Sequence, residues 1–77
     1  MSTVPDGEVE VVVNGKPLQV PLGCSVADVV ARFAPTVRPG RGTAVALNEE
    51  IVPAGRWSQT TVAGGEHLEL LQAVAGG

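Results

Sequence analysis

The sequence contains few of the side chains that carry out chemistry in proteins. Among its 77 residues it has one cysteine (Cys24), one histidine (His67) and two aromatic residues (Phe33 and Trp57). A single cysteine excludes an internal disulfide and a metal cluster held by cysteines, and it fits a reducing, cytoplasmic location. Because aromatic rings are scarce, aliphatic side chains must fill the core of the folded protein.

Positive charge is also scarce. The chain has five Lys and Arg residues and eight Asp and Glu residues, which gives a formal net charge of -3. Arg32, Arg38 and Arg41 flank one loop, without the alternation of basic and aromatic residues that is typical of nucleic-acid binding. Nucleic acids and anionic membranes favour a clustered basic surface, so the composition argues against both as partners. Mild acidity instead suits solubility and docking on a basic protein surface.

Long apolar runs are absent as well. No stretch approaches the roughly 20 apolar residues that a membrane-spanning helix needs. The N-terminal residues include Pro5, Asp6 and Gly7 where a signal peptide would be apolar, so no secretion signal is expected. The composition, with 44% apolar and 17% charged residues, is that of a globular protein. A chain of this length provides one small domain.

Alternating apolar and polar residues predict five strands. The first covers residues 8–13, where Val9, Val11 and Val13 share one face. Asn14-Gly15 follows, a dipeptide that closes tight hairpins. The other strands are predicted at residues 18–20, 44–47, 51–52 and 67–72. The turn Asn48-Glu49-Glu50 is expected before the fourth strand, and Gly64-Gly65 is expected to form a hairpin turn before the last.

The last predicted strand has two distinct faces. Leu68 and Leu70 lie on one face and are expected to point into the core. The opposite face is formed by His67, Glu69 and Leu71.

One helix is predicted between the second and third strands. Ser25 is typical of a helix N-cap, because its hydroxyl can accept from the backbone N–H of Asp28, and the Asp28 carboxylate suits the positive first turn. The apolar stripe consists of Val26, Val29, Val30 and Phe33. Pro35 ends the helix, and residues 35–42 are expected to form a loop.

These elements predict an α+β fold with one helix packed across a mixed sheet of four to five strands. Residues 8–72 form the domain. Residues 1–7 are expected to be a flexible extension, and residues 73–77 a flexible C-terminal tail.

The sequence offers no catalytic or metal-binding constellation. Cys24 precedes a helix, where a thiol can become reactive, but a small residue filling a turn is the favoured interpretation. No carboxylate is placed to orient His67 as a base. Glu49 and Glu50 are interpreted as solvated turn residues, and Gly64-Gly65 has no following helix that would make a phosphate site. The chain is therefore not expected to be an enzyme.

The C-terminal end is the most informative feature. Gly76-Gly77 and the alanines before it form a tail almost without side chains, which can enter a narrow channel. A terminal carboxylate becomes an acyl donor once it is converted to an acyl-adenylate, and a sulfur nucleophile can then form a thiocarboxylate or thioester. A terminus without function is the competing interpretation of the dipeptide alone.

Several segments together resemble one family. They are Val13-Asn14-Gly15, the helix from Ser25, residues 45–53 (Val-Ala-Leu-Asn-Glu-Glu-Ile-Val-Pro), Trp57, and the ending at residues 72–77. With these segments the chain resembles the sulfur carrier proteins of thiamine biosynthesis (the ThiS family), which have the ubiquitin-like β-grasp fold. The resemblance covers residues 11–77. Ile-Val-Pro followed by tryptophan four residues later is fairly specific, whereas Gly-Gly is shared by all ubiquitin-like carriers.

The resemblance implies partners and site residues. In the family, an ATP-dependent activating enzyme related to ubiquitin activators adenylates the terminal carboxylate. Sulfur from a donor such as a cysteine desulfurase yields a thiocarboxylate, which thiazole synthase consumes. Gly77 would be the modified residue, and Val74, Ala75 and Gly76 the tail required for activation. Leu71 would be the outward apolar residue that binds a partner, and no cofactor would be bound by the carrier itself.

Other functions remain open at this stage. The small subunit of molybdopterin synthase is also β-grasp and ends in Gly-Gly, but those chains usually lack the Ile-Val-Pro and tryptophan segment. A carrier for cysteine or another thiolated metabolite is a further possibility. A protein modifier, whose Gly77 would join lysines through isopeptide bonds, belongs to a different class. A purely structural interaction module gives the Gly-Gly end no role.

Overall fold

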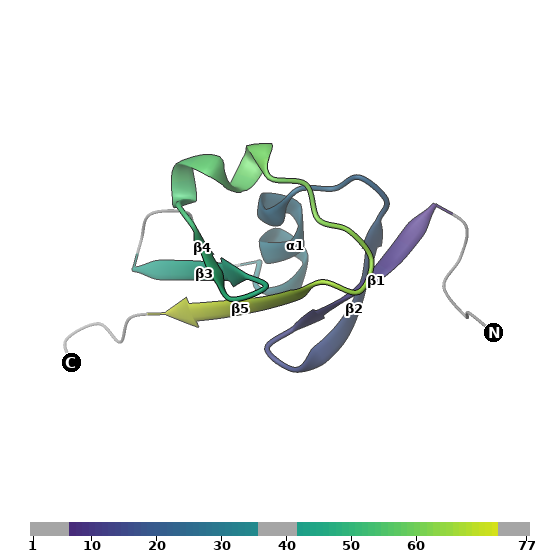
Figure 1. The fold of residues 1–77 in the computed structure, drawn as a ribbon, viewed down its shortest axis with the longest axis horizontal. Coiled ribbons are helices and arrows are strands. Elements are labelled where there is room, and N and C mark those ends of the chain that lie inside the picture. Colours follow the sequence, from purple (N-terminus) through teal and green to yellow (C-terminus); the bar gives the residue numbers. More distant parts are fainter. Residues whose placement is uncertain (1–6, 36–41, 73–77) are drawn as a thin grey trace.

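The structure, a computed structural model, describes residues 7–35 and 42–72. These two segments form five strands, one α-helix and one 3-10 helix (Figure 1). In chain order the elements are β1 (Glu8–Val13), β2 (Lys16–Pro21), α1 (Val26–Phe33), β3 (Thr43–Leu47), β4 (Glu50–Val52), η1 (Ala54–Gln59) and β5 (His67–Gln72). Pro35 and Gly42, the ends of the predicted loop, are described, and the residues between them lie outside these segments.

The strands form one mixed sheet in the order β2-β1-β5-β3-β4. β1 and β5 are parallel, whereas β1 and β2, β3 and β4, and β3 and β5 are antiparallel. The last strand in the sequence is therefore the central strand of the sheet. This arrangement confirms the predicted α+β fold, and Figure 1 shows α1 packed behind the sheet.

The first hairpin has the predicted turn. Asn14 and Gly15 have φ angles of 52° and 81°, and the turn brings Val13 opposite Lys16. β2 begins two residues earlier than predicted and contains Pro17. Because β2 lies at the edge of the sheet, the missing N–H of Pro17 can point away from β1 without breaking the ladder.

The helix begins and ends as predicted. Asp28 N–H donates to the Ser25 hydroxyl over 3.2 Å, and the Ser25 N–H donates to Asp28 Oδ2 over 3.0 Å. This reciprocal pair is a capping box, which satisfies two backbone donors that the helix leaves free. Val26, Val29 and Val30 are buried, so the stripe faces the core.

The turn between β3 and β4 is shorter than predicted. Asn48 and Glu49 have φ angles of 50° and 73°, and they form a two-residue turn. Glu50 is not a turn residue, because it begins β4 and lies opposite Leu47. The sequence did not indicate that the turn ends at Glu49, because glutamate rarely adopts a positive φ.

The prediction of a hairpin at Gly64-Gly65 is wrong. The pair forms a turn, and Gly65 N–H donates to the Glu10 carbonyl over 2.8 Å. The segment before it pairs with the start of the helix instead, through a bridge between Thr61 and Ser25. β5 therefore has no hairpin partner next to it in the sequence, and it pairs with β1 and β3.

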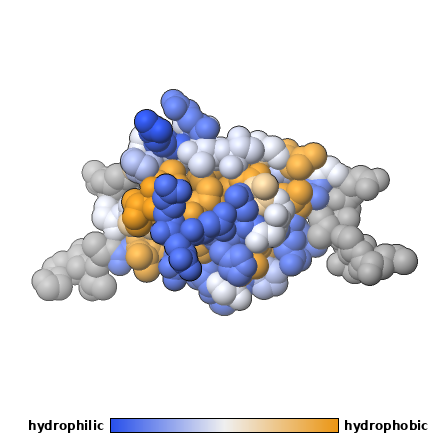
Figure 2. Space-filling view, in the orientation of Figure 1, coloured by the Kyte–Doolittle hydropathy of each residue, from blue (hydrophilic) through white to orange (hydrophobic). Residues whose placement is uncertain are grey.

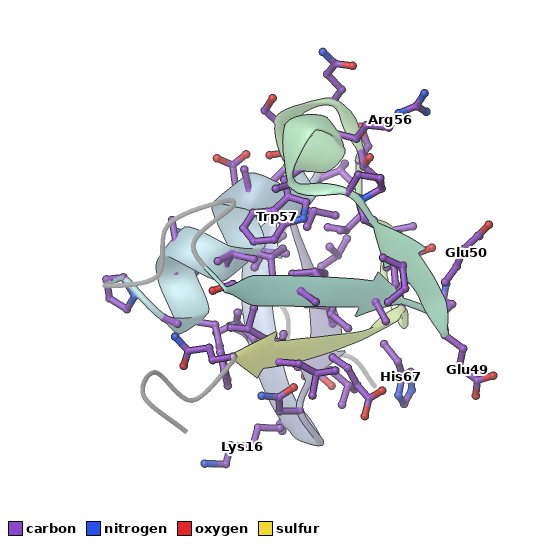
Figure 3. All side chains as sticks on the ribbon, turned by 90° about the vertical axis from the view of Figure 1, so that its left-hand side faces the viewer. Lys16, Glu49, Glu50, Arg56, Trp57 and His67 are labelled. Carbon is purple, nitrogen blue, oxygen red and sulfur yellow. The ribbon has the colours of Figure 1, made fainter. Side chains whose placement is uncertain are left out.

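The core is mainly aliphatic, as the composition predicted. It consists of Val11, Val13, Val20, Cys24, Val26, Val29, Val30, Val45, Val52, Trp57, Val62 and Leu68. Trp57 is 1% exposed and points inward between α1, η1 and β3 (Figure 3). One large ring thus fills the space between the sheet and the two helices.

Candidate functional site at the end of the central strand

The proposed tail begins where β5 ends. Val74, Ala75, Gly76 and Gly77 lie outside the described residues, so the structure describes only the point from which they extend, Gln72. β3 pairs with the whole of β5, from Leu47 opposite Leu68 to Thr43 opposite Gln72. The base of the tail is therefore part of the central strand of the sheet.

Pairing on the other side of β5 stops earlier. β1 pairs with β5 only through Val12 opposite His67 and Val13 opposite Leu68. After Val13 the chain turns away into the first hairpin, and Asn14 N–H donates to the Leu68 carbonyl over 3.0 Å. Beyond this bond, β1 provides no backbone partner for β5.

The side chain of Asn14 continues the pairing. Leu70 N–H donates to Asn14 Oδ1 over 2.8 Å, and Asn14 Nδ2 donates to the Leu70 carbonyl over 3.2 Å. The primary amide thus acts as one further residue of β1, with both backbone groups of Leu70 satisfied. Analysis of the sequence missed this contact, because Asn-Gly indicated only a turn and the two residues are 56 positions apart.

A second asparagine binds the start of β5. Asn48 N–H donates to the His67 carbonyl over 2.7 Å, and His67 N–H donates to Asn48 Oδ1 over 3.0 Å. Asn48 Nδ2 donates to Glu66 Oε2 over 3.1 Å. The two hairpin turns therefore bind the central strand at two points, His67 and Leu70, each through an asparagine with positive φ.

Leu71 is exposed, as its predicted position on the outward face requires. Its exposed fraction is 57%, against 2% for Leu68 on the inward face. The residue opposite Leu71 on β3 is Ala44, and two residues later Ala46 lies opposite Ile51 of β4. Ile51 is 62% exposed. Because cross-strand partners share a face, the outward residues form one apolar surface, the outer strip, which consists of Ala44, Ile51 and Leu71. Ala46 lies on the same face but is only 7% exposed.

The outer strip lies on the side of the sheet that is turned away from α1. Figure 2 shows hydrophobic side chains at the surface over β3 and β4, with hydrophilic side chains beside them. Sequence analysis found Leu71 but missed Ile51, because Ile51 lies in a segment too short for an alternation pattern.

An acidic hollow adjoins the outer strip. It has a volume of about 270 Å³ and is lined by Val12, Asn14, Gly15, Ala46, Glu49, His67, Leu68 and Glu69. Figure 3 shows Glu49 and His67 projecting from neighbouring positions, away from Trp57. Two carboxylates around an apolar floor suit a positively charged side chain of a protein partner.

Cys24 is part of the core and not a reactive group. Its exposed fraction is 9%, and burial raises the pKa of its thiol above the ordinary value, with the Asp28 carboxylate adding to the effect. A thiol with a raised pKa is a weak nucleophile at neutral pH, since the thiolate is the reactive form. This agrees with the interpretation of Cys24 as a small packing residue.

The described residues contain no metal-binding cluster. Within residues 7–35 and 42–72 no group of three or more His, Cys, Asp or Glu side chains could bind a metal ion. In the same segments, no helix has the length and apolar character needed to cross a membrane.

Comparison with known proteins shows that this chain is similar to members of one family in both sequence and fold. The model of the ThiS family matches residues 7–77. The sulfur carrier protein ThiS of Escherichia coli (strain K12) is 29% identical over 68 residues, which cover 88% of this chain and 98% of that protein.

Two solved structures of a thiamine biosynthesis protein from Geobacter metallireducens are similar as well. Each is 28% identical and covers 90% of this chain. The crystal structure, described as ThiS, has a TM-score of 0.70 over 100% of its chain, and the NMR solution structure has 0.69 over 88%.

Proposed function

This chain belongs to the ThiS family, and from that membership we infer that it is a sulfur carrier protein of thiamine biosynthesis, a carrier and not an enzyme. The observation that supports this most strongly is the match of the family model from residue 7 to residue 77. The match includes the Gly-Gly end, which the alternative of a structural interaction module leaves without a role. The Escherichia coli relative, which is named a sulfur carrier protein, aligns over almost its full length.

The proposed reaction takes place at the carboxylate of Gly77. A carboxylate oxygen attacks the α-phosphorus of ATP on the activating enzyme, and pyrophosphate leaves. A hydrosulfide equivalent then attacks the acyl carbon, and AMP leaves with that oxygen. The product is a thiocarboxylate, in which one oxygen of Gly77 has been replaced by sulfur. ATP is consumed by the activating enzyme, and no cofactor is bound by the carrier.

The tail has to reach the active site of another protein. Gly76 and Gly77 have no Cβ, and Val74 and Ala75 have small side chains, so the backbone can pass through a narrow channel. Gly77 lies five positions after Gln72, the last residue of β5, and an extended chain spans at most about 3.3–3.6 Å per residue. The tail can therefore enter a channel on the order of 20 Å deep while the domain remains at the surface of the partner.

The outer strip is the proposed docking surface. Leu71 and Ile51 are more than half exposed, although they are large aliphatic residues. Leu71 also lies two residues before the start of the tail at residue 73. A partner that covers the outer strip with apolar residues, and places a basic side chain in the acidic hollow, would receive the tail at a fixed position.

Three partners follow from this function. The first is the activating enzyme, which binds ATP and recognises the outer strip. The second is a sulfur donor such as a cysteine desulfurase, and the third is thiazole synthase, which takes the sulfur from the thiocarboxylate. The first and third need access to the same tail, so we expect them to compete for the carrier.

Complementation separates the proposed function from the nearest alternative. The gene for this chain should restore growth without thiamine in a bacterium that lacks its own thiazole sulfur carrier. It should not restore molybdenum cofactor formation in a bacterium that lacks the small subunit of molybdopterin synthase. Rescue of the second strain alone would overturn the assignment in favour of molybdopterin synthesis. A chain without Gly77 is the matched control and should rescue neither strain.

A further inference from the structure

The central strand is held unequally along its length. Its first half lies between β1 and β3, whereas its last residues are paired with β3 alone, because the β1 pairing ends at Val13 and Leu68. An end of a strand that is paired on one side opens more readily than one paired on both. In this chain, that end is the base of the reactive tail.

The amide of Asn14 compensates for the missing backbone partner. It accepts from Leu70 N–H over 2.8 Å and donates to the Leu70 carbonyl over 3.2 Å. Leu70 is followed directly by Leu71, the proposed docking residue, and then by Gln72, the last residue of β5. The two bonds therefore fix the backbone directly before the docking residue and the base of the tail.

We propose that Asn14 is a positioning residue for the transfer reaction, because its two hydrogen bonds to Leu70 hold Leu71 and the base of the tail in one fixed arrangement. The inference rests on the proposed function. Docking through Leu71 and delivery of the Gly77 carboxylate must occur on the same partner at the same time. If the backbone around Leu71 is already fixed in the free carrier, fewer residues lose conformational freedom when the complex forms. Reactions at the Gly77 carboxylate also depend strongly on the placement of the reacting groups.

A simpler role for Asn14 must be distinguished from this one. Asparagine is common at the first position of two-residue hairpin turns because it tolerates positive φ, and Asn14 has a φ of 52°. Glycine tolerates the same conformation without a side chain. Asn14→Gly therefore keeps the turn, removes the two hydrogen bonds to Leu70 and takes one side chain from the lining of the acidic hollow.

The chain provides a matched control for loss of such bonds. Asn48 also has a positive φ and also accepts a hydrogen bond from the backbone of β5, but at His67, at the opposite end of the strand from the tail. Asn48→Gly should therefore lower stability by the same mechanism without disturbing Leu70. Amide hydrogen exchange measured by NMR should show faster exchange at Leu70 in Asn14→Gly and at His67 in Asn48→Gly.

The test is the rate of thiocarboxylate formation with the activating enzyme, ATP and sulfide, followed by intact-protein mass spectrometry. Asn14→Gly should lower kcat/KM on the order of tenfold or more. Asn48→Gly should lower the melting temperature by a similar amount, but its kcat/KM should stay close to that of the unchanged protein. Asn14→Asp, which can still accept from Leu70 N–H but cannot donate to its carbonyl, should fall between the two and serves if Asn14→Gly does not fold.

The two claims fail in different ways. Equal effects of Asn14→Gly and Asn48→Gly on the rate, or an unchanged rate in Asn14→Gly, would overturn the positioning role while the carrier function stands. Absence of any thiocarboxylate on the unchanged protein would overturn the proposed function itself, and the positioning role with it.

Discussion

The indole Nε1 of Trp57 donates a hydrogen bond to the carbonyl of Val52, over a distance of 2.9 Å. The bond is buried, and it joins η1 to the end of β4. Pro53 lies between the two elements and has an extended conformation, with φ of -57° and ψ of 145°. The spacing of tryptophan four residues after Ile-Val-Pro is therefore the spacing that returns the ring to the strand it follows.

Replacing Trp57 tests this relationship. Trp57→Phe keeps an aromatic ring but leaves the Val52 carbonyl without its donor, which should cost about 1–3 kcal/mol of unfolding free energy. Trp57→Ala also leaves a cavity and should cost about 3–5 kcal/mol. Urea unfolding followed by far-UV circular dichroism measures both, with Ser58→Ala on the exposed side of η1 as the control. Equal stability of Trp57→Phe and the unchanged protein would show that the hydrogen bond contributes nothing.

A charge placed under the helix should prevent folding. Val30 is 5% exposed and belongs to the core. Val30→Asp buries a carboxylate without a partner, a change comparable to the entire stability of a small domain. Ala31→Asp, at the next and exposed position, is the control and should fold. Circular dichroism and thermal melting compare the two, and a cooperatively melting Val30→Asp protein would contradict the packing of α1 on the sheet.

Stability should depend on the charge of Asp28 in acid. Hydrogen bonds from the Ser25 N–H and hydroxyl lower the pKa of Asp28 below its ordinary value of 3.8. The unfolded chain therefore takes up this proton at a higher pH than the folded chain. The contribution of Asp28 should be fully present above about pH 5 and should be lost as the pH falls through the lowered pKa.

Unfolding free energies of the unchanged protein and Asp28→Ala, measured across this range, test the expectation. The difference between the two proteins should be constant near neutral pH and should shrink in acid. A difference that does not change with pH would mean that the charge of Asp28 contributes nothing to stability.

Much of the fold could be predicted because the signals are local. The alternating valines of β1, the Asn14-Gly15 turn and the Ser25 cap each follow from residues close together in the sequence. The outward position of Leu71 followed from the same alternation in β5. β2 was predicted shorter than it is in the structure because it contains Pro17 and Pro21, which only an edge position permits.

The remaining features depend on contacts between distant segments. Nothing near Gly64-Gly65 indicates that β5 pairs with β1 and β3 rather than with the segment before it. The bonds from Asn14 to Leu70 and from Asn48 to His67 require the finished sheet, so neither asparagine could be assigned to the site from its neighbours. Exposure of Ile51 likewise depends on the register of β4 against β3.

The docking role of Leu71 can be measured separately from folding. Leu71→Glu should leave the melting temperature nearly unchanged, because the side chain is more than half exposed. The same change should raise the KM of the activating enzyme for the carrier on the order of tenfold, as expected when an apolar interface anchor is replaced by a charge.

Leu22→Glu is the matched control for this prediction. Leu22 is 69% exposed and follows β2 beside the start of β1, at the opposite end of β5 from Leu71. Its replacement should leave KM unchanged. An equal effect of both substitutions would indicate a general response to added negative charge, and the outer strip would then not be the docking surface.

The central claim is that sulfur is bound at the carboxylate of Gly77, and intact-protein mass spectrometry tests it most directly. With the activating enzyme, ATP and sulfide, the mass should change by the exchange of one oxygen for sulfur, and thiazole synthase with its substrates should restore the original mass. Cys24→Ala should react in the same way, whereas deletion of Gly77 or one added C-terminal residue should abolish the change in a protein that remains folded. Sulfur found on Cys24, or a reaction that survives the loss of Gly77, would contradict the account.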